Sequence, residues 1–216
     1  SRSASAFFAS PFEEATLLVF DGAGEDVSTT LAVGAGTDLR VLRSIPWPHS
    51  LGHFYSAMTG FLGFAMLDGE YKMMGLAPYG SPDYLPFIRQ NILLTDAPGS
   101  YRLNGDLLDY HAALKKQFHP KLLEAFGSPR LSDDAPFTER HRQIAASAQA
   151  AFEEVVGDMA SWAFQQGGKR TNVAIAGGCG LNCSANGKLL RDGPFTRMYV
   201  PPAPHDAGCA VGAALL

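Results

Sequence analysis

The sequence predicts an α/β fold, on three observations. Three strand-like segments follow one another near the start, joined by short turns rich in glycine. The last third alternates between helical and strand-like segments, which is typical of parallel strands connected by helices. The chain has 216 residues, of which 46% are hydrophobic and 18% charged, so it is long enough and apolar enough to bury a proper core.

The early strands are expected at residues 14–21, 28–33 and 39–45, and their short connections predict an antiparallel meander. Asp21 ends the first of them, directly before a turn that reads DGAGE. A carboxylate at a strand end above a glycine-rich turn is well placed to hold a metal ion or a polar substrate group. The commoner explanation for an isolated Asp-Gly pair is a side chain that caps its own turn.

The middle of the chain begins with residues 50–67, which are apolar nearly all round and predict a buried helix. His53 lies inside this helix, where a satisfied core histidine is a commoner role than a ligand. Glu70 and Lys72 precede a stretch rich in Gly, Pro and Tyr, which we expect to be a loop of the kind that carries function. Residues 81–140 are irregular and rich in Pro, Asp and Gly, and they predict an insertion that covers one edge of the domain.

The last third opens with a helix expected at residues 143–166 and a strand at 172–176. Gly177 and Gly178 follow the strand at once, ahead of a helix expected at 181–190. Backbone without Cβ atoms lets a ligand approach closely, and the helix N-terminus favours an anion such as phosphate. Many α/β proteins have such a turn without any ligand, so alone it is a weak signal. Asp206 follows a last strand at 197–200, where it either caps the final helix or faces a cleft at the strand ends.

The predicted order of elements is close to that of one lobe of the actin-like ATPase (ribonuclease H-like) fold. It runs three strands, helix, insertion, helix, strand, helix, strand and helix. In that fold two such lobes enclose a nucleotide. We therefore predict a single domain over residues 1–216 that forms one lobe. The abrupt first residues and the uncapped apolar end lead us to expect that the first lobe lies outside this sequence.

Composition disfavours several classes of function. A formal net charge of −4 gives no electrostatic footprint for nucleic acid or for an anionic membrane surface. No apolar run reaches the roughly 18 residues that span a bilayer. The three cysteines, an odd number, indicate reduced thiols and a cytoplasmic protein. Cys179 and Cys183 are spaced for a metal pair, but without a second pair nearby such a site is disfavoured.

Several blocks, in one order across nearly the whole chain, resemble the nodulation-type O-carbamoyltransferases. They read ASAFFASPFEEA, FDGAGE, SLGHFYSAMTGFLGF, YKMMGLAPYG, AGGCGLNCSANGKLL and PPAPHDAGCAVGAAL. The resemblance implies an enzyme of two domains. One makes carbamoyl adenylate from carbamoyl phosphate and ATP. The other is similar to the universal tRNA threonylcarbamoyl transferase and moves the carbamoyl group onto a hydroxyl. This chain resembles the second, C-terminal lobe of that latter domain.

The resemblance also implies roles for individual residues. Asp21 and Asp206 match ligands of a divalent metal, for which iron(II), manganese or magnesium would suit hard carboxylate donors. The nucleotide, ATP or carbamoyl adenylate, would contact residues that lie in two segments. These are Gly177, Gly178 and Asn182 in the glycine-rich turn, and Glu70 with Lys72.

One departure from the family pattern concerns the metal. The family places an H-x-x-x-H motif just before A-S-A-F, but Arg2 stands at the position of its second histidine and the first would fall before Ser1. Two carboxylates alone would bind a transition metal weakly, and a cation such as Arg2 would oppose it.

The sequence thus predicts part of an ATP-dependent O-carbamoyltransferase that acts on a sugar or another secondary metabolite, for example in antibiotic biosynthesis. Its expected partners are carbamoyl phosphate, a hydroxyl-bearing acceptor, the first lobe and the adenylate-forming domain, so the chain alone should be inactive. The sequence nominates no catalytic base. One alternative is a degenerate nucleotide-binding module without catalysis. Another is an actin-like sugar kinase, which the A-P-Y-G and G-G-x-x-L-N blocks disfavour.

Overall fold

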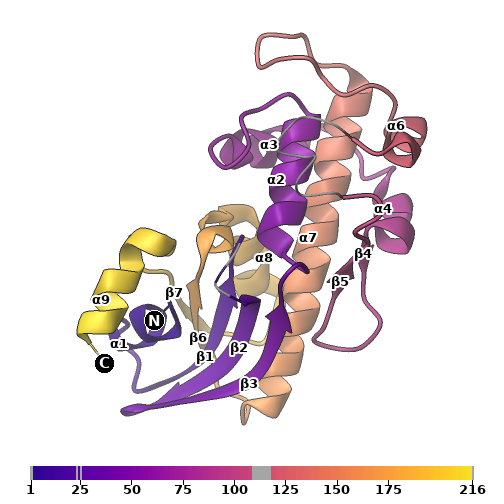
Figure 1. The fold of residues 1–216 in the computed structure, drawn as a ribbon. Helices are drawn as coiled ribbons and strands as arrows, with labels where there is room; N and C mark the ends of the chain where they lie inside the picture. Colours follow the sequence, from indigo (N-terminus) through magenta and orange to yellow (C-terminus); the bar gives the residue numbers. More distant parts are fainter. Residues whose placement is uncertain (1, 23, 25, 109–117, 216) are drawn as a thin grey trace. The chain divides into compact units, whose positions relative to one another are not determined.

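A computed structural model describes residues 2–22, 24, 26–108 and 118–215 (Figure 1). The chain forms two compact units. The first consists of residues 1–52, 97–100 and 155–216, and the second of residues 53–96 and 101–154. Two of the four boundaries between the units fall within helices, α2 (Leu51–Phe61) and α7 (Glu139–Gln166).

The first unit is built on a five-stranded mixed sheet with the order β3-β2-β1-β6-β7. The strands are β1 (Glu14–Phe20), β2 (Val27–Ala35), β3 (Asp38–Pro46), β6 (Asn172–Ala176) and β7 (Arg197–Tyr199). Strands β1, β2 and β3 form the predicted antiparallel meander, whereas β6 lies parallel to β1 and β7 parallel to β6. The predicted α/β class is therefore confirmed, with the strands close to their expected positions.

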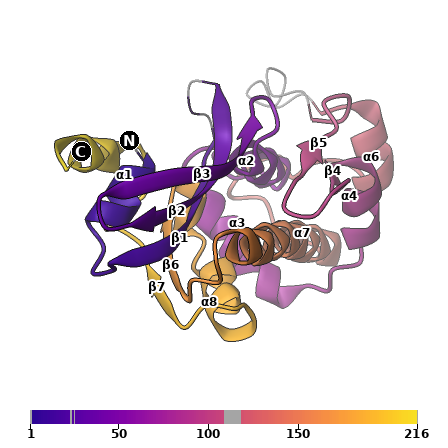
Figure 2. The same ribbon diagram turned by 90° about the horizontal axis from the view of Figure 1, so that it is seen from below.

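Helices lie on both faces of this sheet. Figures 1 and 2 show α1 (Arg2–Phe8) and α9 (Cys209–Ala214) side by side on one face, with α8 (Cys183–Asp192) on the other. Because successive strand residues point to opposite faces, Ala15, Leu17 and Val19 of β1 share one face. They form a buried cluster with Phe7 of α1. A Cβ on Gly34 would come within 2.6 Å of the Phe7 ring, so this glycine lets α1 sit close to the sheet.

The second unit is mainly helical. It contains most of α2, α3 (Glu70–Leu76), α4 (Leu85–Asn91), α6 (Pro120–Phe126), the first part of α7 and a short hairpin, β4 (Leu93–Leu94) with β5 (Arg102–Leu103). The ring of Phe126 contacts the rings of Phe61, Tyr84 and Phe87 edge-on in its buried core. None of the described helices is both long enough and apolar enough to cross a membrane.

The helix predicted at 50–67 ends sooner, at Phe61. Gly63 follows with a φ of +77°, and the Phe64 N–H donates to the Thr59 carbonyl at 3.2 Å, which is the usual glycine stop of a helix. A Cβ on Gly63 would come within 2.8 Å of the Arg130 carbonyl oxygen. The chain therefore turns here because another segment packs against that glycine.

The loop predicted after Glu70 and Lys72 is wrong, because that stretch continues helix α3 to Leu76 and then forms a 3-10 turn, Ala77–Tyr79. The Glu70 carboxylate accepts hydrogen bonds from the Leu67 N–H at 2.8 Å and from Ser56 Oγ at 2.6 Å. An acidic side chain in the first turn stabilises a helix through the helix dipole. The described part of residues 81–140 contains α4, α6 and the hairpin, and residues 109–117 lie outside the described residues; its role as an insertion stays a prediction.

Candidate functional site at the carboxyl ends of the parallel strands

Three loops of the first unit meet at one edge of the sheet. Strands β1, β6 and β7 run parallel, so their carboxyl ends lie at the same edge. Asp21 follows β1, Gly177 follows β6, and Asp206 comes shortly after β7. The Gly177 N–H donates to the Pro204 carbonyl at 2.7 Å, which ties the second loop to the third.

Asp21 is held by both its backbone and its side chain. Its N–H donates to the Ser28 carbonyl at 2.9 Å, and its carbonyl accepts from Ser50 Oγ at 2.8 Å. Carboxylate oxygen Oδ1 accepts from the Gly22 N–H at 2.8 Å and from the Gly178 N–H at 3.4 Å. Asp21 therefore both caps its own turn and lies at the site. Its carboxylate links the turns after β1 and β6.

Arg2 joins Asp21 to Asp206. Its Nη2 atom forms ion pairs with Asp21 Oδ2 and with Asp206 Oδ1. We call these three residues the Asp–Arg–Asp cluster. The side chains of Arg2 and Asp21 are 19% and 13% exposed, whereas that of Asp206 is 84% exposed. The cluster thus brings the two predicted carboxylates together, one of them sheltered and the other at the surface.

Asp206 is the first residue of a 3-10 turn, Asp206–Gly208, and does not cap the final helix with its side chain. His205 caps this 3-10 turn, since its Nδ1 accepts from the Ala207 N–H at 3.3 Å, and the final helix α9 has Gly208 at its N-cap. The Asp206 carboxylate is therefore directed to Arg2 and not to the backbone of its own turn.

A divalent metal does not fit the cluster as it stands. Within the described residues, no group of three or more His, Cys, Asp or Glu side chains is arranged to hold a metal ion. Hard divalent cations such as magnesium take about six oxygen ligands, and the guanidinium of Arg2 already lies against both carboxylates. The metal role of Asp21 and Asp206 stays a prediction that these contacts do not support.

The two glycines after β6 differ in what they do. Gly177 is buried with a φ of +88°, and a Cβ there would come within 2.0 Å of the Phe20 carbonyl oxygen. It is required by close packing of the chain on β1 and not by a ligand. At Gly178 the nearest atom to an added Cβ is Asp21 Oδ1 at 3.7 Å, so only Gly178 leaves room beside its backbone.

Gly178 begins a 3-10 turn, Gly178–Leu181, that precedes α8. Helix α8 begins at Cys183 and not at the expected residue 181. Asn182 is the N-cap of α8: its Oδ1 accepts from the Ala185 N–H at 3.0 Å, and the residue is 7% exposed. A buried N-cap amide stabilises the helix start. Contact of Asn182, Gly177 and Gly178 with a nucleotide stays a prediction.

Glu70 and Lys72 belong to the second unit, where each has a partner. Glu70 accepts from the Leu67 N–H and from Ser56 Oγ, and Lys72 forms an ion pair with Asp133. The hydrogen bond that Lys72 donates to Asp133 is the main cause that raises the pKa of Lys72 above its ordinary value. Their role near a nucleotide also stays a prediction.

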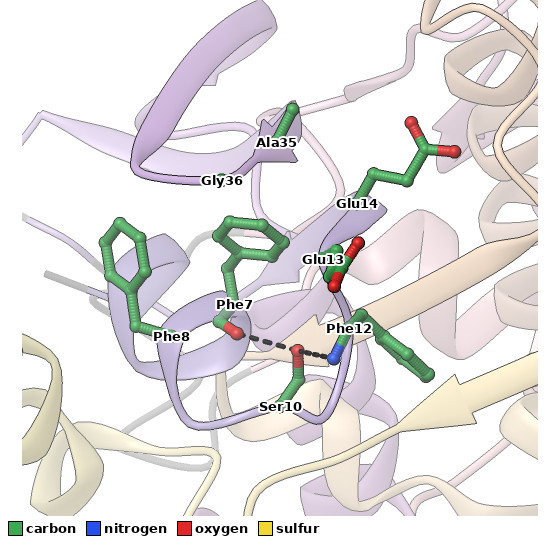
Figure 3. Close-up of a pocket in the computed structure, with 8 residues that line it drawn as sticks. All are labelled: Phe7, Phe8, Ser10, Phe12, Glu13, Glu14, Ala35 and Gly36. Carbon is green, nitrogen blue, oxygen red and sulfur yellow. Dashed lines mark hydrogen bonds between the residues drawn. The ribbon is translucent and has the colours of Figure 1, made fainter.

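A cavity of about 640 Å³ lies at the other end of β1, where Glu14 begins the strand (Figure 3). Aromatic side chains and two glutamates line it; they are Phe7, Phe8, Phe12, Glu13 and Glu14, beside Ser10, Ala35 and Gly36. Arg170 pairs with the Glu14 carboxylate at 3.2 Å, and the Arg197 guanidinium lies 4.9 Å from the centre of the Phe12 ring. Cations of the chain itself therefore occupy two of the groups that would attract a charged ligand.

The chain matches a known protein family over nearly its whole length. The family model described as the carbamoyltransferase N-terminus matches residues 1–215. The chain belongs to the carbamoyltransferase family. The resemblance inferred from the sequence blocks is thereby confirmed.

Similar proteins match this carbamoyltransferase chain over nearly its whole length. It is 46% identical to an uncharacterized protein of Synechocystis sp. over 100% of the chain and 35% of that protein. It is 42% identical to nodulation protein NolO of Bradyrhizobium diazoefficiens, over 98% and 36%. It is 27% identical to 3′-hydroxymethylcephem-O-carbamoyltransferase of Streptomyces clavuligerus, over 93% and 35%. The chain thus spans about a third of the length of these relatives.

Sequence reasoning missed three features of the site. Helix α1, which carries Arg2, was not expected, nor were the hydrogen bond from Ser50 to Asp21 and the cap provided by His205. The position of Arg2, where the family pattern has a histidine, was the available signal. It marked the side chain that faces both carboxylates.

Proposed function

We propose that the full-length protein containing this chain is an ATP-dependent O-carbamoyltransferase. It would transfer a carbamoyl group from carbamoyl adenylate to a hydroxyl of a sugar or another secondary metabolite. The observation that carries the proposal is the family match over residues 1–215. A second support is the relative from Streptomyces clavuligerus, whose name states O-carbamoyl transfer to a hydroxymethyl group.

The fold supports a nucleotide site. The antiparallel meander followed by two parallel strands has the order expected of an actin-like lobe, and we include that assignment in the proposal. Gly178, where an added Cβ would meet only Asp21 Oδ1 at 3.7 Å, leaves room beside its backbone for a phosphate group. The N-terminus of α8, a ten-residue helix, adds a positive dipole end nearby. A complementary lobe and an adenylate-forming domain would complete the enzyme.

The reaction asks mainly for positioning. The acceptor oxygen attacks the carbamoyl carbon, the bond between that carbon and the phosphate oxygen of AMP breaks, and the hydroxyl proton passes to a base or to phosphate. Holding two reactants in line contributes much of the rate, and fixed charges stabilise the oxygen that becomes negative. In this chain the Asp–Arg–Asp cluster joins the loops after β1 and β7, and Asp21 also holds the backbone of Gly178.

The test is turnover by the full-length protein supplied with ATP and carbamoyl phosphate. We expect pyrophosphate to be released only when both are present, and labelled carbamoyl to appear on an added hydroxyl acceptor. Release of ADP with phosphorylation of the acceptor would reject the proposal. ATP binding without pyrophosphate release would favour the degenerate nucleotide-binding module. The observation that favours this degenerate module is that Arg2 lies between the predicted metal ligands.

A further inference from the structure

We infer that Arg2 takes the place of a divalent cation in this chain. Its guanidinium is the positive charge that Asp21 and Asp206 hold, and it keeps a metal ion out from between them. The exclusion of metal stands on geometry and charge alone. The consequence for catalysis, a transfer step that needs no metal at this cluster, rests on the proposed function.

The geometry leaves one position for a cation. Both carboxylates use one nitrogen of the same side chain, so an ion that bridged them would have to lie where Nη2 lies. Arg2 Nη1 lies close to Gly24, where an added Cβ would come within 3.3 Å of it. A planar guanidinium with several N–H donors suits such shared carboxylates better than a point charge does.

The charges point the same way. Two carboxylates and one guanidinium sum to one net negative charge. A divalent ion added beside Arg2 would face a like charge within a few ångströms, at a site that is partly sheltered from solvent. Removal of the arginine would leave two negative charges together, which attracts a divalent ion.

Arg2 is fixed where it is by the fold. Helix α1 packs on α9, β1 and β6, and Ala4, Ala6 and Phe7 are buried. Ser5 Oγ donates to the Arg2 carbonyl at 2.8 Å, which reinforces the first turn of the helix. Asp21 is fixed by the four hydrogen bonds given above. The pair between Arg2 and Asp21 therefore belongs to the folded core of the unit, whereas the exposed Asp206 completes it from the surface.

The experiment is a manganese(II) titration of the full-length protein without nucleotide, after treatment with a chelator. Bound and free ion are measured by electron paramagnetic resonance. We compare the wild type with Arg2→His, Arg2→Lys, Asp206→Asn and the combination of Arg2→His with Asp206→Asn. Arg170→His is the matched control, because Arg170 pairs with a carboxylate, Glu14, at the other end of β1. Circular dichroism checks that each variant is folded.

In the wild type and in Arg2→Lys we expect no manganese binding that depends on Asp206. In Arg2→His, which offers a neutral imidazole and two carboxylates, binding should become at least about tenfold tighter and vanish when Asp206→Asn is added. Arg170→His should gain nothing. Wild-type binding that Asp206→Asn removes would overturn the inference. So would a folded Arg2→His variant that gains no affinity.

The activity arm uses preformed carbamoyl adenylate, because ATP brings its own magnesium. We expect the wild type to transfer carbamoyl equally with and without chelator. Transfer that stops with chelator and returns with manganese would overturn the inference. An absence of transfer under every condition would count against the proposed function, while the manganese titration would still decide the role of Arg2.

Discussion

Asp21 and Asp206 contact the same nitrogen atom, Nη2 of Arg2, although they follow different strands of the sheet. The two carboxylates are unequal in their surroundings. Asp21 is largely buried and also accepts from two backbone N–H groups, whereas the Asp206 side chain is 84% exposed. Within the Asp–Arg–Asp cluster, Asp21 therefore supports the fold, whereas Asp206 lies at the surface. Replacing the two aspartates should change the stability of the protein by different amounts.

Asp21→Ala should lower the free energy of unfolding by about 1–3 kcal/mol, because it removes the sheltered partner of Arg2 and the acceptor for the Gly22 and Gly178 N–H groups. Asp206→Ala should lower it by less than about 1 kcal/mol, since exposed ion pairs contribute little. Urea denaturation of the full-length protein, followed by circular dichroism, measures both. An equal loss for the two variants, or a greater one for Asp206→Ala, would contradict the assigned asymmetry.

The two glycines after β6 offer a second comparison. Gly177→Ala should destabilise the protein by more than about 2 kcal/mol, because its φ of +88° is unfavourable for alanine and the methyl group would overlap the Phe20 carbonyl. Gly178→Ala should change stability by less than about 1 kcal/mol, yet weaken ATP binding at least about tenfold if the nucleotide uses that backbone. Thermal unfolding and calorimetric titration with ATP separate the two effects.

Gly75→Ala is the matched control for both glycines. It lies inside helix α3, and an added Cβ would meet nothing within 4 Å. Alanine there should be neutral or stabilise by up to about 1 kcal/mol. If Gly178→Ala bound ATP as the wild type does, the nucleotide would not lie against that residue. A stable Gly177→Ala variant would show that the turn after β6 has another backbone arrangement.

His141 predicts a pH dependence of the second unit. It lies in the first turn of α7, where its Nδ1 accepts from the Thr138 N–H at 3.1 Å and its own N–H donates to Thr138 Oγ1 at 3.4 Å. This reciprocal pair is a capping box in which histidine stands in the place of glutamine. Burial lowers the pKa of His141 below its ordinary value of 6.5, and three arginines, Arg140, Arg130 and Arg142, lower it further.

Because the folded pKa is lowered, the unfolded chain takes up the proton first as the pH falls. The contribution of His141 is therefore complete above about pH 6.5 and is lost as the pH falls below that value, by up to about 1.4 kcal/mol per pH unit. Denaturation midpoints between pH 7.5 and about pH 5 measure this loss. His141→Gln keeps an acceptor for the Thr138 N–H but does not titrate, so its profile should be flatter. Parallel profiles for the two proteins would contradict the assignment.

Periodicity in the sequence located the elements whose burial is regular. The apolar runs of β1 and β6 and the long apolar stripe of α7 come from residues that alternate or recur at helical spacing, and the structure has these elements where they were expected. Glycine-rich turns located the meander, because such turns mark the ends of strands. At the site, strand ends with Asp21, Gly177 and Asp206 were visible because parallel strands bring their carboxyl ends to one edge.

The remaining features depend on contacts between distant segments. Helices α1 and α3 have only seven residues each, too short for a periodic signal, and helices of this length depend on tertiary packing. The need for glycine at position 177 comes from the Phe20 carbonyl, far away in the sequence. The pairing of Arg2 with both aspartates likewise follows from the way α1 packs against α9, which no local pattern encodes.

The measurement that tests the central claim most directly follows both half-reactions in full-length Asp21→Ala, under conditions where the variant is folded. Release of pyrophosphate from ATP in the presence of carbamoyl phosphate reports adenylate formation, and labelled carbamoyl on the acceptor reports transfer. Since Asp21 holds Arg2 and the backbone of Gly178, we expect pyrophosphate release close to that of the wild type and transfer reduced at least about a hundredfold. Transfer at the wild-type rate would contradict the claim that this edge of the sheet is the transfer site.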